Sequence, residues 1–189
     1  MRIGIMGGTF NPIHVGHLIA ASEVYRELNL DRVLFIPAGQ PWQKAGVSIA
    51  PAVDRLAMVQ RAIDSDARFS ASDIEITHDG PTYAVETMDR LTAQLPNDEF
   101  FWIVGEDVLA TLTTWHEWER FVQQVTVVVV NRQGDPDVSA PFDFIRVSMP
   151  EVRVSASQLR ARYALGDDCR YLVPESVTTY VKENSLYLT

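Results

Sequence analysis

Cysteine is almost absent from this 189-residue chain. The single cysteine, Cys169, can form neither an internal disulfide nor a multi-thiolate metal site, which fits a reducing compartment. Long apolar runs are also missing, since no stretch approaches the roughly 20 residues that a bilayer-spanning helix needs. No charged-then-apolar leader opens the sequence. We therefore expect a cytoplasmic protein without a membrane partner.

Excess positive charge is missing as well. The chain has 16 Lys and Arg against 25 Asp and Glu, a formal net charge of -9 at pH 7. Such a charge opposes the field of a nucleic-acid backbone, so we expect no nucleic acid as a partner. Internal repeats are also lacking, and 47% hydrophobic residues suffice for one substantial core. We expect a single domain over residues 1–189, with C-terminal helices from about residue 155, and the sequence leaves a homo-oligomer open.

What is present is an alternation of short apolar runs with helix-like stretches. Runs typical of buried strands occupy residues 2–6, 32–38, 73–77, 99–105, 125–131 and 144–149. Helices are expected at residues 17–28, 53–63, 83–95, 155–166 and 174–185. On the second of these helices, the apolar face is expected to contain Val53, Leu56, Val59, Gln60 and Ile63. The alternation indicates an α/β fold, a Rossmann-like open parallel sheet with helices on both faces.

The turn after the first expected strand has an unusual composition, MGGTFNPIHVGH at residues 6–17. Ligands of open parallel sheets bind beyond the carboxyl ends of the strands, and glycines let the backbone approach them closely. His14 and His17 are three residues apart, so both imidazoles can point into one anion pocket at the start of a helix. A helix cap and a metal site are the alternative readings, although two histidines alone make an incomplete ligand set.

The same turn resembles the signature loop of the nucleotidylyltransferase superfamily, whose pattern is roughly G-x-F-D-P-x-H-x-G-H. Further segments match superfamily motifs in the expected order: IPAGQPWQK (36–44), GPTYAVET (80–87), VGEDVLATLTTWHEW (104–118), VVVVNRQG (127–134), VSASQLRAR (154–162) and RYLVPESVTTYV (170–181). The chain is most similar to the bacterial members that act on nicotinic acid mononucleotide. It departs from them at Asn11, where aspartate is common, at Gln43, where many have histidine, and at Ala84, which lacks a usual hydroxyl.

The resemblance implies transfer of AMP from ATP to nicotinic acid mononucleotide, with Mg²⁺ accompanying ATP. It gives the catalytic roles to His14, His17 and Arg160, the last clamping the leaving pyrophosphate. The remaining ATP contacts are implied at Gly8, Thr9, Phe10, Gly105, Asp107, Ser155 and Ser157. The acceptor site is implied at Lys44, Thr82, Tyr83, Trp115 and Arg132, with the pyridine ring stacked on Trp115.

Other interpretations stay open. Asp107 is equally typical of a helix N-cap, and His78 and His116 are interpreted as structural. Another nucleotidylyltransferase, acting on nicotinamide mononucleotide or phosphopantetheine or transferring a cytidylyl group, would share the same loop; the segment at 80–87 and the region around Trp115 favour a pyridine acceptor. A non-catalytic nucleotide-binding module is expected to have lost one of the catalytic residues, and this chain retains all three.

Overall fold

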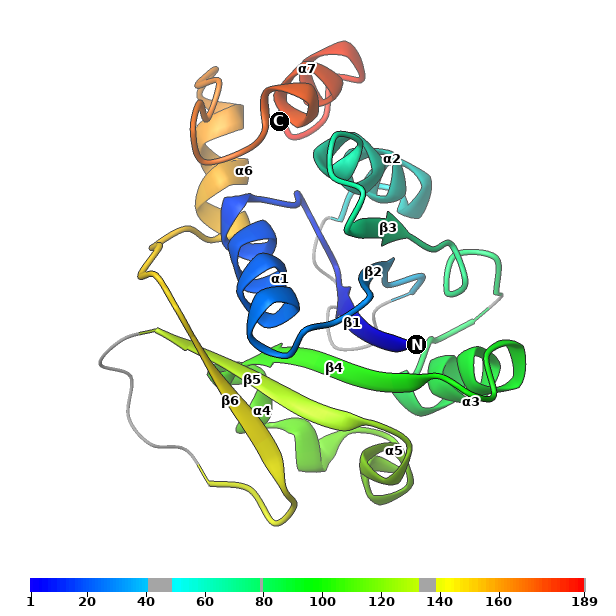
Figure 1. Ribbon diagram of the computed structural model, residues 1–189. Coiled ribbons are helices and arrows are strands. Elements are labelled where there is room, and N and C mark those ends of the chain that lie inside the picture. Colours follow the sequence, from blue (N-terminus) through cyan, green and yellow to red (C-terminus); the bar gives the residue numbers. More distant parts are fainter. Residues whose placement is uncertain (41–48, 79, 133–138, 189) are drawn as a thin grey trace.

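A sheet of six parallel strands forms the centre of the computed structural model, which describes residues 1–40, 49–78, 80–132 and 139–188 (Figure 1). In chain order the strands are β1 (Arg2–Gly8), β2 (Arg32–Pro37), β3 (Phe69–Ala71), β4 (Glu99–Gly105), β5 (Thr126–Arg132) and β6 (Phe144–Met149). Their order across the sheet is β3-β2-β1-β4-β5-β6, and each neighbouring pair is parallel. The expected parallel α/β sheet is confirmed.

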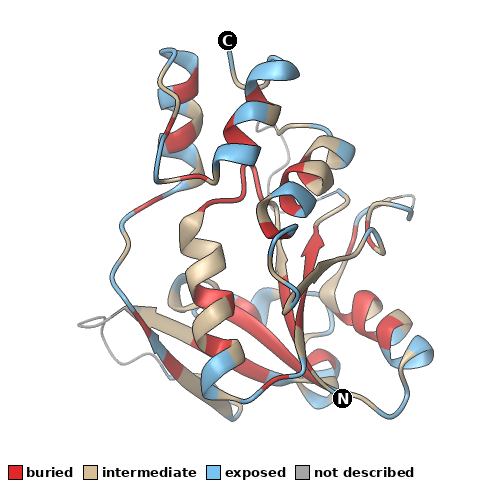
Figure 2. Ribbon diagram, turned by 45° about the horizontal axis from the view of Figure 1, so that its top comes forward, coloured by how far each residue is buried: buried red, intermediate tan, exposed pale blue. Residues whose placement is uncertain are grey.

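Helices cover both faces of this sheet, as expected (Figure 2). They are α1 (Val15–Glu27), α2 (Ala52–Ile63), α3 (Ala84–Gln94), α4 (Glu106–Leu109), α5 (Trp118–Gln124), α6 (Ala156–Ala164) and α7 (Glu175–Glu183), with a 3-10 turn at Leu112–Thr114. Residues of α1, α2, α6 and α7 share one hydrophobic core, and those of α3, α4 and α5 share the other. Within the described ranges, no helix has both the length and the apolar character needed to cross a membrane.

The strands supply both cores because successive side chains point to opposite faces of a sheet. In β4, Phe101 and Ile103 pack on the α1 side, whereas Phe100, Trp102 and Val104 pack on the α3 side. A strand buried on both faces needs apolar residues at nearly every position. The near-continuous apolar runs of the sequence follow from this arrangement.

The sheet order reverses between β1 and β4, and there the two strands separate. Their pairing ends at Ile5 and Trp102. Beyond these residues β1 continues beside β2 as far as Gly8, and β4 continues beside β5 as far as Gly105. The carboxyl ends of the two central strands are thus no longer paired with each other, which leaves room for a ligand at the position typical of open α/β sheets.

The strand predicted at residues 73–77 is wrong. These residues form a turn, in which the backbone N–H groups of Ile76 and Thr77 donate to the carbonyl of Asp73. The strand that pairs with β2 lies earlier, at Phe69–Ala71. The alternation in DIEIT suggested a strand, whereas the segment turns and folds the side chain of Glu75 inward, where it is buried.

The apolar face predicted for α2 is also partly wrong. Val53 is 65% exposed, and the buried residues of this helix are Arg55, Met58, Val59 and Ile63. The helix therefore turns a charged residue inward at its beginning. This arginine contributes to the site described below.

Candidate functional site

A cavity of about 990 Å³ lies at the carboxyl ends of β1 and β4. Its walls come from the loop between β1 and α1, the beginnings of α1 and α3, the end of β4 with α4, and residues 115–116. The volume is within the range of small-molecule sites. It is lined by these residues predicted from the sequence: Gly8, Thr9, His14, His17, Thr82, Tyr83, Gly105, Asp107 and Trp115.

His14 and His17 form a stacked pair at the beginning of α1. Their ring centroids are 3.8 Å apart with an interplanar angle of 23°. His14 occupies the N-cap position, and its backbone N–H donates to Nδ1 of His17 at 3.2 Å. Because Nδ1 accepts this bond, the ring proton of His17 is assigned to Nε2, which is then a donor. The first turn of α1 contains no acidic residue, so its positive end is not neutralised there.

Phe10 supports this pair from the core. Its ring is buried and contacts the ring of His17 edge-on, with centroids 5.1 Å apart, and that of Phe35 at 5.9 Å. A Cβ added to Gly8 would lie 3.2 Å from the Phe10 ring, so the glycine permits the close approach. Phe10 does not line the cavity.

Arg55 is the most deeply buried charge near the loop, with 1% exposure. Its guanidinium donates to three backbone carbonyls: Nη1 to Thr9 at 2.9 Å, Nη2 to Gly39 at 3.1 Å and Nε to Ala50 at 3.0 Å. Burial lowers the pKa of Arg55 from its usual value. Sequence reasoning missed this residue, although a charge at helical spacing from Met58 and Val59 was a signal that could have found it.

Glu75 is a second buried charge, and it lines the cavity next to Thr82. Oγ1 of Thr87 donates to its carboxylate at 2.8 Å. Burial raises the pKa of Glu75 above its ordinary value of 4.5. The carboxyl was missed because its segment was interpreted as a strand.

Trp115 forms an aromatic wall of the cavity and packs against other rings. It packs edge-on toward Trp102 at 6.5 Å and tilted toward Phe121 at 5.7 Å, while part of its surface lines the cavity. His116 also lines the cavity and lies beside Tyr83, with ring centroids 4.5 Å apart. The sequence interpretation of His116 as structural overlooked this position, which its neighbour Trp115 could have indicated.

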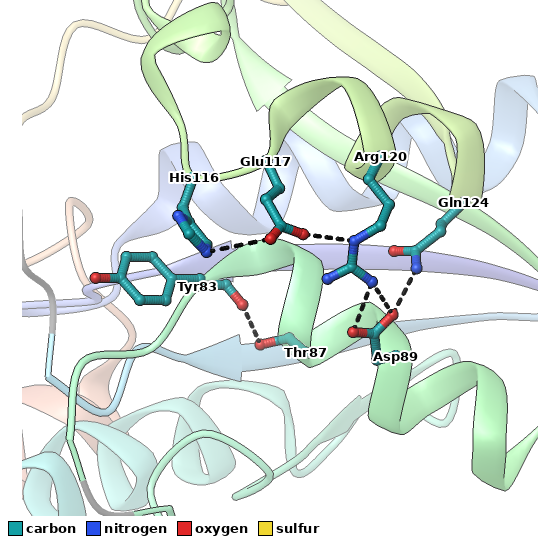
Figure 3. A network of polar contacts seen from close by, with 7 residues as sticks. All are labelled: Tyr83, Thr87, Asp89, His116, Glu117, Arg120 and Gln124. Atoms are coloured by element: carbon teal, nitrogen blue, oxygen red, sulfur yellow. Dashed lines mark hydrogen bonds and ion pairs between the residues drawn. The ribbon is translucent and has the colours of Figure 1, made fainter.

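A polar network holds this wall against α3 (Figure 3). Arg120 donates through Nη1 to both carboxylate oxygens of Asp89, at 2.7 and 2.8 Å, and through Nε to Glu117 at 2.6 Å. Gln124 adds a bond to Asp89 at 2.6 Å, and Nε2 of His116 is 3.7 Å from Glu117. The hydrogen bond from Arg120 lowers the pKa of Asp89. The network ties residues 116–117 to α3.

Two glycines permit close contacts at the ends of β1 and β4. A Cβ at Gly7 would lie 2.8 Å from the Trp102 ring, and one at Gly105 would lie 2.6 Å from Oδ1 of Asp107. The Asp107 carboxylate therefore folds over the end of β4, facing the cavity. Its neighbour Glu106 pairs with Arg146 at 3.1 Å.

Ser155, Ser157 and Arg160 do not line the cavity. Ser155 caps α6 by accepting from the backbone N–H of Gln158 at 3.3 Å. Arg160 donates to Oγ of Ser157 at 3.2 Å and to the carbonyl of Asn11 at 2.8 Å, so it reaches the loop that carries the histidines. Gln43 and Lys44 lie outside the described residues, and for Arg132 only the backbone at the end of β5 is described.

In the part of the chain that the structure describes, no three His, Cys, Asp or Glu side chains come together in a group that could hold a metal ion. Cys169 is buried, with Sγ 3.7 Å from the carbonyl oxygen of Leu159, and burial raises the pKa of its thiol.

The strand order places the histidine loop at the point where that order reverses, the usual ligand site of an α/β nucleotide-binding fold. Similarity to known proteins gives the class as nucleotidyltransferase. Residues 5–162 match the cytidylyltransferase-like family model. Over 198 residues the chain is 44% identical to a protein of Dehalococcoides mccartyi named probable nicotinate-nucleotide adenylyltransferase, with 99% of this chain and 97% of that one covered. A Thermus thermophilus protein of the same name is 42% identical over 187 residues, covering 99% and 100%. The chain belongs to the nicotinate-nucleotide adenylyltransferase family.

A solved structure agrees in fold. The nicotinic acid mononucleotide adenylyltransferase of Plasmodium falciparum, complexed with NaAD, superposes with a TM-score of 0.83 and covers 98% of this chain and 97% of its own. The same enzyme complexed with APC gives a TM-score of 0.80. Sequence identity is 18% in both cases, so this likeness establishes the architecture alone.

Proposed function

We propose that the chain transfers the adenylyl group of ATP to nicotinic acid mononucleotide, giving nicotinic acid adenine dinucleotide and pyrophosphate. The observation that carries the proposal is the cavity itself, which combines the histidine pair with an aromatic wall in a chain whose full-length relatives have this activity in their names. In the reaction, an oxygen of the acceptor 5'-phosphate attacks the α-phosphorus of ATP in line. The bond to the bridging oxygen breaks, and that oxygen leaves with pyrophosphate.

The histidine pair is proposed to bind the phosphates. Nε2 of His17 donates toward the oxygens on which charge grows, while Nδ1 is engaged by the loop backbone. The stacked ring of His14 fixes the orientation of its neighbour. The unneutralised end of α1 adds a favourable field for an anion. Catalysis of this kind consists of positioning and charge stabilisation and needs no nucleophilic residue.

The ATP site is proposed to extend from these histidines to Asp107. The backbone at Gly8 and Thr9 lies along the cavity and allows a nucleotide to approach closely. The carboxylate of Asp107, folded over Gly105, is suited to accept hydrogen bonds from ribose hydroxyls.

Arg160 is proposed to contact the leaving pyrophosphate, for which a planar guanidinium is well suited. Its support is its bond to Asn11, which brings it to the loop that carries His14. Ser157 holds the guanidinium from the other side, and Ser155 begins the helix that carries it.

The acceptor is proposed to bind at the aromatic wall. The pyridine ring stacks on Trp115, with Thr82 and Tyr83 on another side and His116 close to Tyr83. Lys44 and Arg132 are proposed to meet the phosphate or the carboxylate of the acceptor.

Adenylyl transfer from ATP generally uses a divalent metal ion, and we propose Mg²⁺. Magnesium usually keeps several water ligands and binds through phosphates with one or two carboxylates. The cavity fits this mode, since Glu106 and Asp107 are single carboxylates at its edge rather than a cage. The three acidic residues of the lining, Glu75, Glu106 and Asp107, carry charge of the same sign as the phosphates. The ion would neutralise the phosphate charge.

Pyrophosphate release is the measurement that tests the proposal. ATP is supplied with nicotinic acid mononucleotide, nicotinamide mononucleotide or phosphopantetheine in parallel. The highest kcat/KM is expected for nicotinic acid mononucleotide. A higher value for another acceptor would assign the chain to a different reaction of the superfamily, and tight ATP binding without any product would make it a binding module.

A further inference from the structure

Asn11 lies at the centre of a polar cluster that does not line the cavity. Its side chain is 3% exposed, and Oδ1 accepts two hydrogen bonds, from the hydroxyl of Tyr187 at 2.7 Å and from the backbone N–H of Ala50 at 3.1 Å. Its carbonyl accepts from Arg160 at 2.8 Å. Two of these partners come from the last thirty residues of the sequence, whereas Asn11 precedes His14 by three positions in the loop.

Tyr187 is built to act as a fixed donor in this cluster. Its ring stacks on that of Tyr163, with centroids 6.1 Å apart and an interplanar angle of 24°. Burial raises the pKa of its hydroxyl, which favours the protonated form that can donate. The backbone of Tyr187 has a φ of 63°, in the left-handed region that residues with a side chain rarely adopt. The surrounding contacts outweigh this cost.

The same part of the sequence also contacts the residue that follows His14. The backbone N–H of Val15, the first residue of α1, donates to the carbonyl of Leu172 at 3.0 Å. His14 is therefore flanked by two residues, Asn11 and Val15, that are bonded to segments beside α6 and α7. If these C-terminal residues served only to pack α7 on the molecule, they would not need hydrogen bonds to the loop that carries His14.

We propose that Tyr187 is a positioning residue for the loop of the histidine pair, acting through Asn11. Its hydroxyl holds residues 9–14 in the conformation in which His14 and His17 meet a polyanion such as the triphosphate of ATP. The inference rests on the proposed function insofar as it assigns the phosphates to this loop. Tyr187 itself does not touch the substrate.

The test compares Tyr187→Phe with a matched control, Tyr180→Phe. The hydroxyl of Tyr180 also donates a hydrogen bond to a side chain, Oδ1 of Asp54 at 2.8 Å, but this bond joins α7 to α2 and not to the loop. We expect Tyr187→Phe to raise both the KM for ATP and the Kd for a non-hydrolysable ATP analogue by about three- to tenfold, the equivalent of one hydrogen bond. The KM for the acceptor is expected to stay unchanged. Tyr180→Phe is expected to change none of these constants.

A second variant separates positioning from stability. In an Asn11→Ala background, Tyr187→Phe is expected to have no further effect on analogue binding, because both changes remove the same contact. Thermal melting of every variant shows which are folded at the assay temperature. If folded Tyr187→Phe binds the analogue as tightly as the wild type, or if the two substitutions act additively, the inference is wrong. Binding of the analogue can be measured without turnover. A wild type that is inactive with every acceptor would therefore refute the proposed function, while the Kd values of the variants would still test the role of Tyr187.

Discussion

The two ring nitrogens of His17 are proposed to have separate tasks, which different substitutions can separate. His17→Asn keeps a polar group near the position of Nδ1 but removes the donor at Nε2, and His17→Gln does the reverse. We expect His17→Asn to lower kcat by about 10²–10³, the usual effect of removing one charge-stabilising donor. His17→Gln should retain more activity. Pyrophosphate release at saturating substrates measures both, and a fully active His17→Asn enzyme would contradict the phosphate role.

His116 offers a matched control elsewhere in the cavity lining. It is also a histidine of the cavity lining, but it lies beside Tyr83 and Trp115. His116→Ala should therefore change the ratio of kcat/KM between nicotinic acid and nicotinamide mononucleotide while leaving the KM for ATP unchanged. A rise in the KM for ATP instead would show that His116 contacts ATP and not the acceptor.

Arg55 should matter chiefly for stability, because its guanidinium joins three separate segments through their carbonyls. Arg55→Met leaves these buried acceptors without their donor, and we expect the free energy of unfolding to fall by about 2–4 kcal/mol. Arg26 is the control, since its side chain is 67% exposed and pairs within α1. Arg26→Met should leave the urea midpoint nearly unchanged. Equal midpoints for the two variants would refute the assigned role of Arg55.

Glu75 should make stability depend on pH. Burial raises the pKa of Glu75 in the folded state, so the folded protein binds more protons than the unfolded one above the ordinary value of 4.5. Stability then decreases as pH rises from that value to the raised pKa, and levels off beyond it. Glu75→Gln lacks this loss, and its amide oxygen can still accept from Thr87. Urea unfolding of both proteins from pH 4 upward should show the variant gaining relative to the wild type; a constant difference would contradict the burial cost.

At the residue scale, sequence reasoning found the side chains that belong to motifs and missed those that depend on tertiary contacts. His14 and His17 stand at the beginning of α1, Asp107 follows the end of β4, and Trp115 follows the 3-10 turn; all four line the cavity. Arg55 acquires its partners only when residues 9, 39 and 50 are adjacent. Helical spacing could have placed Arg55 on the buried face of α2, but no local pattern encodes which carbonyls are adjacent to it.

At the scale of elements, α3 and α5 are joined by the network around Arg120. Arg120→Ala would free Glu117 and hence the segment that carries Trp115 and His116. We expect the KM for the acceptor to rise by about three- to tenfold because the stacking wall is no longer held in place. Arg90→Ala is the control, since Arg90 pairs with Glu86 inside α3 at 3.9 Å and donates to the carbonyl of Ile74 at 3.4 Å, so its described contacts join α3 to another segment than α5. Steady-state kinetics with varied acceptor measures the difference, and equal KM values would show that the wall needs no such support.

Elements were predicted well where periodicity was long and poorly where it was short. The helix predicted at 83–95 is observed at Ala84–Gln94, and the helical spacing of Val85, Met88 and Leu91 matches their burial. The segment at 73–77 has only five residues, over which a turn and a strand give the same alternation. The observed β3 is a three-residue strand at the sheet edge, which is too short to show a hydrophobic periodicity in the sequence.

At the scale of the whole molecule, the cavity exists because the pairing of β1 with β4 ends at Ile5 and Trp102. The alternation of strands and helices predicts a parallel sheet, but strand order and register depend on contacts between segments far apart in the chain. The glycines at the strand ends follow from this geometry, since a side chain at Gly7 would collide with the Trp102 ring. The glycine-rich loop at residues 6–17 therefore indicated that the cavity lies at the end of the first strand, but it did not indicate that β4 is the other strand beside it.

The net charge of -9 also acts at this scale, since it repels ATP and the mononucleotide before either reaches the cavity. Raising the ionic strength from about 0.01 M to about 0.15 M shortens the screening length from about 30 Å to about 8 Å. We therefore expect kcat/KM for ATP to increase over this range at constant free Mg²⁺, whereas kcat at saturation should be nearly constant. The charge-reducing variant Glu175→Gln/Glu183→Gln, on exposed positions of α7, should raise the low-salt value and lose its advantage at high salt. A decrease in kcat/KM with added salt would mean that the local field of the histidine loop and Arg160 outweighs the charge of the molecule.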